Sequence, residues 1–491
     1  MKNSALMYEM IYRILKNKIE SGVLPGGTKL PSRAGLCQEF DTSEKTVRHA
    51  LKMLEEEGLI KTEKRKCPVV AEGCVAVRRT ALGMLKRVDE AAANDILKTG
   101  ILLCYPLNRH GMYLCKGADW DTPKAIISNM NPEKPTEFWR LSNRFWRYFI
   151  TRNGNELIVR AVDSLGMSEL DPLPGTLEMR KNYRSGLAEL IETMERGGIP
   201  ENVHFDDLFV LYGFLPDRIE QAPVYEASPD STLCVGTTGL ERRLRQSQER
   251  YSSVYMDILG LIAIGRYKPG DRLPSHDEMR KCYGVSIDTT IKAIQTLREW
   301  GVVSAVRGKG IFVTMDLEAL QRIAIPPDLI ASHVRSFLDS LELLSITIEG
   351  VAVNAAERAS RAEAEDLRRR LETLWTKEYL YQRSPFLMLE FIVDHIHLEA
   401  LNAIYRMLLA NYHIGRSIPK LIRLEKTPES CKLYGQCQSA VNHLLEGDCR
   451  LFAKETAEMF SDTRDLIIIG CKQLGYWEPA MNVYDGTALW K

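Results

Sequence analysis

The sequence LPSRAGLCQEFDTSEKTVRHALKMLEEEGLI at residues 30–60 is informative about the fold, because a similar sequence, LPSHDEMRKCYGVSIDTTIKAIQTLREWGVV, occurs at residues 273–303. Around these stretches, residues 8–70 and 251–313 align without a gap at one constant offset. A long run of matches at a single offset indicates an internal duplication. We call residues 8–70 the first head and residues 251–313 the second head.

Each head shows the same order of predicted elements. In the first head, an amphipathic helix over residues 6–19 ends near Gly22, a typical helix-terminating residue. Leu30-Pro31-Ser32 opens a short second helix, and Ser43 caps a third helix that ends at Gly58. Two β-prone runs then leave room for a two-stranded wing, at residues 59–60 and 69–70 in the first head and at 302–303 and 311–313 in the second.

The spacing of glycine, proline and hydroxyl residues in both heads resembles the winged-helix DNA-binding domain of the GntR family. The matched positions are Gly22, Gly27, Leu30, Ser43, Thr46, Ala50, Leu54 and Gly58, and in the second head Gly265, Gly270, Leu273, Ser286, Thr289, Ala293, Leu297 and Gly301. The second head adds RGKGIFV at residues 307–313, which is similar to the wing motif of that family. The resemblance implies two winged helix-turn-helix domains that bind double-stranded DNA.

The resemblance places DNA contacts at the helix caps, at the start of the third helix and in the wing. Arg48 is the main candidate for base readout, because an Arg side chain can bridge O6 and N7 of guanine. Serine caps and wing cations would hold phosphates. The predicted DNA-binding residues are Ser32, Arg33, Ser43, Lys45, Thr46, Arg48, Lys64 and Arg65, and in the second head Ser275, His276, Ser286, Thr289, Arg307 and Lys309.

The two heads depart from the family pattern in different ways. The family commonly has Pro-Ser-Glu-Arg, whereas the first head has Pro-Ser-Arg-Ala and the second has Pro-Ser-His-Asp. Ile291 stands where the first head has Arg48, and the glycines of the wing occur only in the second head. We therefore expect unequal half-sites, with the first head reading bases and the second holding the DNA backbone.

The segments behind the heads are predicted to be helical. The Ala-Ala-Glu-Arg-Ala-Ser and Gly-Asp steps at residues 355–360 and 447–448 resemble the effector domain of the FadR branch of GntR regulators. That resemblance implies a small-molecule effector, with carboxylate metabolites as the implied class. The effector-pocket candidates are Trp146, Phe149, Asn155, Asp394 and His397. The aromatic run around Trp146 is more typical of a helix-bundle core.

Many members of that branch bind a metal through one Asp and three His. The corresponding places here hold Ser142 and Trp146 in the first half, and Met388, Ile392, Cys437 and Met459 or Phe460 in the second. These side chains are not a set of zinc or nickel ligands, so we predict no metal and no cofactor. A rival group consists of Asp394, His395, His397, His413 and His443, in which Asp394 and His397 could share one helix face.

Composition and motifs limit the classes of protein to which this chain could belong. The net charge is zero, yet residues 1–70 hold 13 Lys and Arg against 9 Asp and Glu, and residues 247–315 hold 10 against 7. Two modestly basic modules among acidic ones are typical of a chain that meets phosphate with only part of its surface. The 11 cysteines form no C-x-x-C pair, and neither a signal peptide nor a membrane span is present, which predicts a cytoplasmic protein without membrane contact.

No P-loop, dinucleotide fingerprint, H-E-x-x-H or nucleophile elbow occurs, and neither half has room for an aminotransferase-like domain, so we predict that the chain is not an enzyme.

The predicted fold class is mainly α, with two winged helix-turn-helix domains that carry small β-wings, each followed by an all-helical bundle. The predicted boundaries are 1–75 and 76–225 for the first pair, 226–246 for a linker, 247–315 and 316–478 for the second pair, and 479–491 for a tail. The simplest assembly is an intramolecular pseudo-dimer that reads an asymmetric or pseudo-palindromic operator in response to a ligand, with a homodimer as the alternative. The alternative function is a signalling or interaction protein whose winged helices have lost specific DNA binding.

Overall fold

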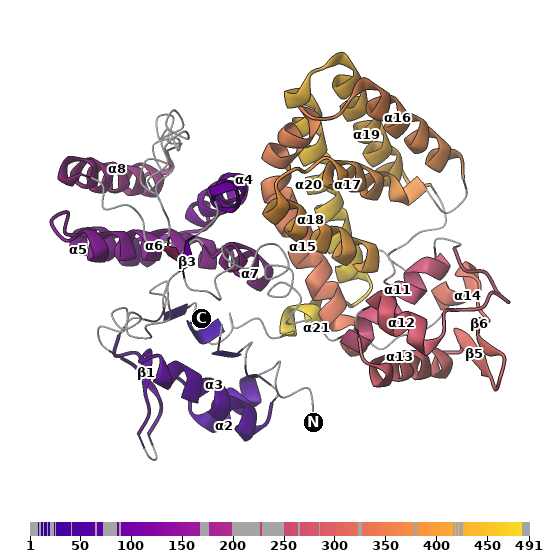
Figure 1. The fold of residues 1–491 in the computed structure, drawn as a ribbon, viewed down its shortest axis with the longest axis horizontal. Helices are drawn as coiled ribbons and strands as arrows, with labels where there is room; N and C mark the ends of the chain where they lie inside the picture. The colour runs from indigo at the N-terminus through magenta and orange to yellow at the C-terminus, as the bar shows by residue number, and fades with distance from the viewer. Residues whose placement is uncertain are drawn as a thin grey trace. The chain divides into compact units, whose positions relative to one another are not determined.

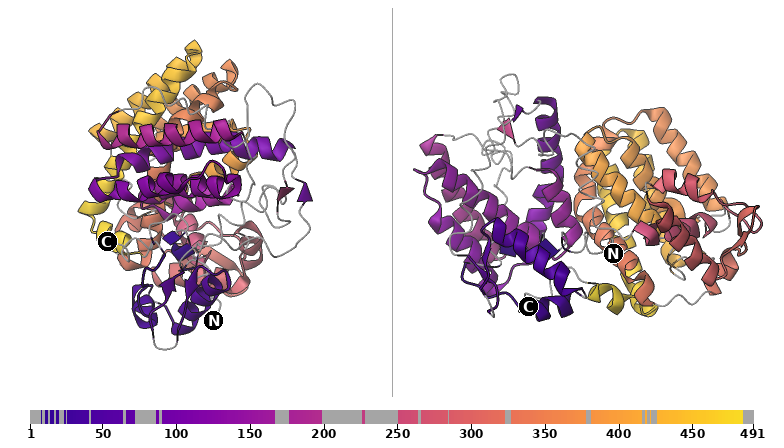
Figure 2. Two further views of the ribbon diagram at one scale, coloured as in Figure 1. Left: turned by 90° about the vertical axis from the view of Figure 1, so that its left-hand side faces the viewer. Right: turned by 60° about the horizontal axis from the view of Figure 1, so that its bottom comes forward.

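The computed structural model describes five long ranges with short gaps inside them, two strand dipeptides, and helical positions between residues 8 and 19. The ranges are 24–71, 90–166, 176–198, 250–322 and 327–483, and the dipeptides are 86–87 and 226–227. This part of the chain is mainly α, as predicted, and it divides near residue 247 into two compact units. Figure 1 draws the first unit in indigo to magenta and the second in pink to yellow, and Figure 2 gives two further views.

The first head is a small helical core closed by a short hairpin. Helix α2 runs over Arg33–Glu39 and helix α3 over Glu44–Glu56, and strands β1 (Ile60–Lys61) and β2 (Val69–Val70) pair antiparallel. Apolar residues from every element meet in one cluster that includes Ile14, Leu36, Phe40, Val47, Leu54 and Val70. The predicted helices, cap and wing strands of this head are therefore present, while Gly22 lies outside the described residues.

The second head repeats this arrangement with a longer wing. Helices α11 (Arg250–Ala263), α12 (His276–Tyr283) and α13 (Ile287–Glu299) precede strands β5 (Val303–Val306) and β6 (Gly310–Val313). Four residue pairs join the two strands, from Val303 opposite Val313 to Val306 opposite Gly310. Arg272 forms a bridge to Phe312, as Lys29 does to Val69 in the first head.

The helices behind the first head form an aromatic core. They are α4 (Glu90–Tyr113), α5 (Asp121–Asn129), α6 (Pro135–Arg152), α7 (Glu156–Ser164) and α8 (Leu177–Glu195), with a short 3-10 helix at Gly117–Trp120. Helix α4 crosses α6 closely, because a Cβ at Gly111 would lie 2.0 Å from the carbonyl oxygen of Phe149. A larger residue at this crossing would force the two helices apart.

A third two-stranded sheet modifies one prediction, the linker at residues 226–246. Strand β3 (Lys86–Arg87) pairs antiparallel with strand β4 (Glu226–Ala227). The segment predicted as a linker, residues 226–246, therefore begins in a paired strand, and the rest of it lies outside the described residues. Two segments far apart in sequence meet here, which no local pattern in the sequence indicated.

The helices behind the second head surround the long helix α15 (Pro327–Ala356). The remaining helices are α14 (Leu317–Arg322), α16 (Arg361–Thr376), α17 (Ser384–Asp394), α18 (Glu399–Gly415), α19 (Pro428–Glu446), α20 (Cys449–Gln473) and α21 (Trp477–Asn482), with a 3-10 turn at Tyr381–Arg383. Helix α15 packs along α20, and α19 packs on α20. The predicted Gly-Asp step separates α19 from α20: Gly447 is left-handed, and Asp448 accepts a hydrogen bond from the Leu451 N–H.

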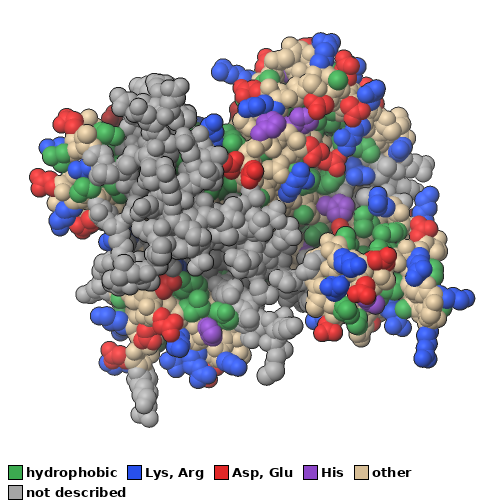
Figure 3. Space-filling model, in the orientation of Figure 1, with side chains coloured by type: hydrophobic (Ala, Val, Ile, Leu, Met, Phe, Trp, Pro, Cys, Tyr) green, Lys and Arg blue, Asp and Glu red, His purple; other side chains and the backbone are tan. Residues whose placement is uncertain are grey.

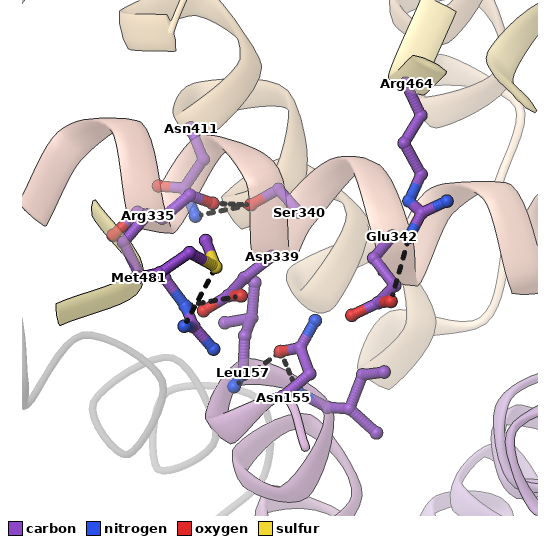
Figure 4. Close-up of polar contacts among 11 residues, drawn as sticks. Asn155, Leu157, Arg335, Asp339, Ser340, Glu342, Asn411, Arg464 and Met481 are labelled. Carbon is purple, nitrogen blue, oxygen red and sulfur yellow. Dashed lines mark hydrogen bonds and ion pairs between the residues drawn. The ribbon is translucent and has the colours of Figure 1, made fainter. Parts of the chain in front are cut away.

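Polar contacts fix α15 among its neighbours (Figure 4). The Asn411 side chain donates to the Ser340 hydroxyl at 2.9 Å, and Arg464 pairs with Glu342 at 3.1 Å. The hydrogen bond joins α15 to α18, and the ion pair joins α15 to α20, so polar contacts hold these three helices together. Within the described residues, no helix combines the length and apolar character needed to cross a membrane.

Candidate nucleic-acid interface

Helix α3 of the first head has one buried face and one exposed face. Val47, Ala50, Leu51 and Leu54 are buried in the core of the head. Arg48 follows the buried Val47 in sequence, yet its side chain is exposed. Glu44 and Lys45 in the first turn are exposed as well. The packing of the apolar face therefore leaves the Arg48 guanidinium on the solvent side of the helix.

The start of α3 is held by Ser43 and Thr46. The Ser43 hydroxyl accepts a hydrogen bond from the Thr46 N–H, and the two hydroxyl oxygens lie 2.9 Å apart. Thr46 is only 3% exposed. Its side chain serves the helix cap, which leaves Lys45 and Arg48 as the exposed basic residues of this helix start.

The remaining predicted contacts of the first head lie at the start of α2 and in the wing. The Ser32 hydroxyl accepts a hydrogen bond from the Gly35 N–H at 3.1 Å, and Arg33 is exposed as the first residue of α2. Lys64 and Arg65 lie outside the described residues. Lys66 beside them forms an exposed ion pair with Glu63.

The second head presents a different exposed face on α13. Ser286 caps the helix as Ser43 does, accepting a hydrogen bond from the Thr289 N–H at 3.2 Å. Ile291, which occupies the place of Arg48, is 47% exposed. Arg307 and Lys309 are exposed in the turn between β5 and β6. Figure 3 shows Lys and Arg side chains on the part of this head that holds the hairpin.

The start of α12 is less suited to phosphate than the sequence suggested. The Ser275 N–H donates to the Glu278 carboxylate at 2.7 Å, and the Ser275 hydroxyl accepts from the Glu278 N–H. Hydrogen bonds from Ser275 hold the pKa of the Glu278 carboxyl below its usual value, so this carboxylate stays charged beside exposed Asp277. His276 lies against Thr290 at 3.0 Å, between α12 and α13. Two negative charges at this helix start disfavour a DNA phosphate there by repulsion, in contrast to α2, whose first turn has no acidic residue.

A polar contact that sequence reasoning missed joins the second head to its helical domain. In the first head, Ile14 and Phe40 are both buried in the apolar core. The matching residues of the second head are Asp257 and Tyr283, and the Tyr283 hydroxyl donates to Asp257 at 2.6 Å. His413 of α18 lies 3.0 Å from the other oxygen of Asp257. The signal was present in the alignment of the two heads, as a carboxylate at an apolar core position.

A second contact lies beside this one. The rings of Tyr255 on α11 and His333 on α15 meet edge to face, with centroids 6.0 Å apart. Burial lowers the pKa of His333 to about 4, so its imidazole is neutral at pH 7. Helix α11 is therefore joined to the helical domain through both α15 and α18.

The effector-pocket candidates of the first unit serve its core and a helix cap. Trp146 and Phe149 are members of the aromatic core, and the Trp146 indole N–H donates to the Tyr183 hydroxyl at 2.8 Å. The Asn155 carboxamide oxygen accepts from two backbone N–H groups as the N-cap of α7 (Figure 4). The expectation that Asp394 and His397 share a helix face is wrong, because α17 ends at Asp394 and His397 lies in the loop beyond it.

The second-half places that correspond to the family's metal ligands lie in the apolar interior of the second unit. Met388, Ile392, Cys437, Met459 and Phe460 are all fully buried. The rival group is dispersed, since His395 faces Glu363, His413 faces Asp257 and His443 faces Glu446. Within the described ranges, no three His, Cys, Asp or Glu residues gather in a way that could hold a metal ion.

The geometry of both heads is that of a winged helix-turn-helix protein, with a capped, exposed third helix and a β-hairpin wing. The model of bacterial regulatory proteins of the gntR family matches residues 7–70 and 250–313. Each head is therefore a winged-helix domain of the GntR family, and the chain carries this domain twice.

One curated relative and two solved structures are similar to parts of the chain. The HTH-type transcriptional regulator TreR of Bacillus subtilis (strain 168) is 36% identical over 72 residues, which are 15% of this chain and 30% of that protein. The chain thus matches about a third of the length of this relative. Streptococcus agalactiae GntR is 15% identical, covering 44% of this chain and 99% of its own, with a TM-score of 0.22. E. coli McbR/YncC is 16% identical, covering 45% and 98%, with a TM-score of 0.23. TM-scores this low do not establish a common fold over the aligned residues. Membership of the FadR branch therefore stays a prediction.

Proposed function

We propose that this chain is a transcriptional regulator that binds one asymmetric or pseudo-palindromic operator through its two unequal heads. The observation that carries the proposal is the exposed start of α3, where Lys45 and Arg48 stand on the solvent face of a capped helix. A helix presented in this way fits the major groove, and an Arg in its first turns can bridge a guanine. Ser43, at the cap, and Arg33, at the start of α2, would lie near the flanking phosphates.

The second head contributes through its wing and the cap of α13. Arg307 and Lys309 at the wing turn, with Ser286 and Thr289 at the cap, are the groups that would approach phosphates. Ser275 and His276 are left out of this set, because both are engaged beside the carboxylates of Asp277 and Glu278.

Response to a small-molecule effector, with carboxylates as the proposed class, would run from the helical domains to the heads. The contact of His413 with Asp257 supports such a route in the second unit, because it joins α18 to the first helix of the head. A ligand that shifts α18 relative to α15 would change this contact, and it would thereby favour one placement of the head over another.

The proposal predicts that Arg48→Ala weakens binding to the preferred operator. A duplex selected by the wild-type protein from a random pool serves as the probe, and fluorescence anisotropy measures the dissociation constant. Loss of one bidentate base contact costs about 1–3 kcal/mol, which is roughly 5- to 150-fold in affinity. Sequence preference should relax at one base pair, because only that base loses its partner.

Arg361→Ala is the matched control, since Arg361 is an exposed Arg on α16 of the helical domain. It should leave the dissociation constant unchanged. Equal affinity of Arg48→Ala and wild type for the selected duplex would refute the assignment of Arg48. Failure of the wild-type protein to enrich any duplex would instead favour the interaction protein as the function.

A further inference from the structure

Two isoleucines stand exposed on the DNA-facing helix of the second head. Ile287 is 42% exposed and Ile291 is 47% exposed. They are four residues apart on α13, so both lie on the same face of the helix. The first head has Glu44 and Arg48 at these two places. A change from one charged pair to two large apolar side chains on the same exposed face alters what this helix can recognise.

The groups around these isoleucines are those of a DNA-binding surface. Ser286 and Thr289 stand at the cap of α13, and Lys292 follows Ile291 on the exposed side. Arg307 and Lys309 extend from the wing turn, and strand β5 of the wing contacts α13. The acidic residues of α13 are Asp288 and Glu299, and the Lys and Arg residues of α13 and the wing outnumber them.

The major-groove edge of DNA offers one apolar feature to such a side chain. Thymine carries a C5-methyl group there, whereas the other bases present donors and acceptors that an Ile cannot satisfy. We propose that the second head reads thymine methyl groups through Ile291 and Ile287, so that the operator has a thymine-selective half on this side and a guanine contact at Arg48 on the other. This inference rests on the proposed DNA-binding function.

The size of the apolar face favours DNA over a protein partner. Among the described residues of the second head, the large apolar side chains that stand exposed are Ile287, Ile291 and Val306. A stable protein interface buries about 800 Å² on each partner, far more than two or three side chains supply. A thymine methyl needs contact with only one or two of them. The surrounding cations match phosphates on either side of the groove.

Replacement of thymine by deoxyuridine in the selected operator tests this inference. The replacement removes only the C5-methyl group and keeps base pairing and O4. Hydroxyl-radical footprints of the wild type and of Lys309→Ala, compared nucleotide by nucleotide, locate the half bound by the second head. For the wild-type protein, deoxyuridine at the contacted position in this half should weaken binding about fourfold, the value of one apolar methyl contact. Deoxyuridine in the half bound by Arg48 should have no such effect.

The variant Ile291→Ala completes the test. At the thymine contacted by Ile291, this protein should bind the thymine and deoxyuridine operators nearly equally, because the side chain that senses that methyl is gone. A thymine contacted by Ile287 should keep its effect. Gln295→Ala, at another exposed position of α13, is the matched control and should keep the fourfold discrimination. The wild-type comparison needs no variant, so a folding defect in Ile291→Ala cannot hide the result.

Two different results overturn the inference. If the wild-type protein binds its selected operator but ignores deoxyuridine throughout the second half, thymine readout is wrong while the proposed function stands. If no duplex is selected at all, DNA binding itself fails, and the exposed isoleucines then belong to a contact with another protein.

Discussion

Single residues set the difference between the two heads. At the apolar places Ile14 and Phe40 of the first head, the second head has Asp257 and Tyr283, joined by a hydrogen bond. Burial and the neighbouring Asp257 carboxylate raise the pKa of the Tyr283 phenol, so the phenol stays protonated and donates. His413 completes the contact from the helical domain. One head thus keeps an apolar core pair, while the other uses a polar pair that reaches beyond its own domain.

This pair predicts coupling between Asp257→Ile and Tyr283→Phe. Asp257→Ile alone leaves the partly buried Tyr283 hydroxyl without this acceptor, which costs about 1–3 kcal/mol of local stability. The double variant restores the chemistry of the first head, so it should be destabilised by less than the sum of the single variants. Hydrogen exchange at the amides of α11 and α12 measures the local free energy of opening.

The amides of α3 in the first head serve as the internal control, because neither substitution touches that head. Strictly additive effects of the two substitutions would contradict an energetic link between Asp257 and Tyr283.

At the scale of elements, the wing of the second head depends on a backbone conformation that glycine supplies. Gly310 has φ of 122°, and a Cβ there would lie 2.7 Å from the Nε atom of Arg272. Gly310 begins β6 opposite Val306, so the hairpin that presents Arg307 and Lys309 closes at this residue. The first head has Cys67, followed by Pro68, at the place of Gly310, and a wing of only two paired residues on each strand.

Gly310→Ala is expected to open the wing of the second head. An alanine at this φ costs about 1–3 kcal/mol through backbone strain, and its Cβ would displace Arg272. Trypsin should then cleave the chain at Arg307 and Lys309 faster than in the wild type, as followed by mass spectrometry. Gly435→Ala in α19, where a Cβ meets nothing within 4 Å, should leave the cleavage rate unchanged. Unaltered cleavage of Gly310→Ala would mean that the hairpin tolerates a side chain there.

At the scale of the whole molecule, the chain carries two winged-helix heads in one polypeptide. Each compact unit holds one winged-helix head and one set of helices. A closed dimer of identical chains presents two equal heads, whereas a duplicated chain lets each head change independently. Arg48 in one head and Ile291 in the other are the outcome of that independence.

This organisation predicts that one chain occupies one operator. Size-exclusion chromatography with light scattering should give a mass near 55.8 kDa for the protein alone. The complex with DNA should contain one duplex and one chain, because a single chain already supplies two heads. A free mass near twice that value, or two chains on one duplex, would favour the homodimer.

The duplication, the helices of each head, the serine caps and the unequal charge of α3 and α13 could all be predicted from the sequence. These features depend on local residues: a Ser before a helix caps it, and apolar residues at helical spacing form a buried face. Which polar residues reach the surface, and which contact one another, became clear from the folded chain alone. The Thr46 side chain is buried at the helix cap. Asp394 is the last residue of α17, whereas His397 lies beyond the helix. Asp257 of the second head contacts His413 of the helical domain. Such outcomes arise from packing between segments distant in sequence, and no local pattern specifies that packing.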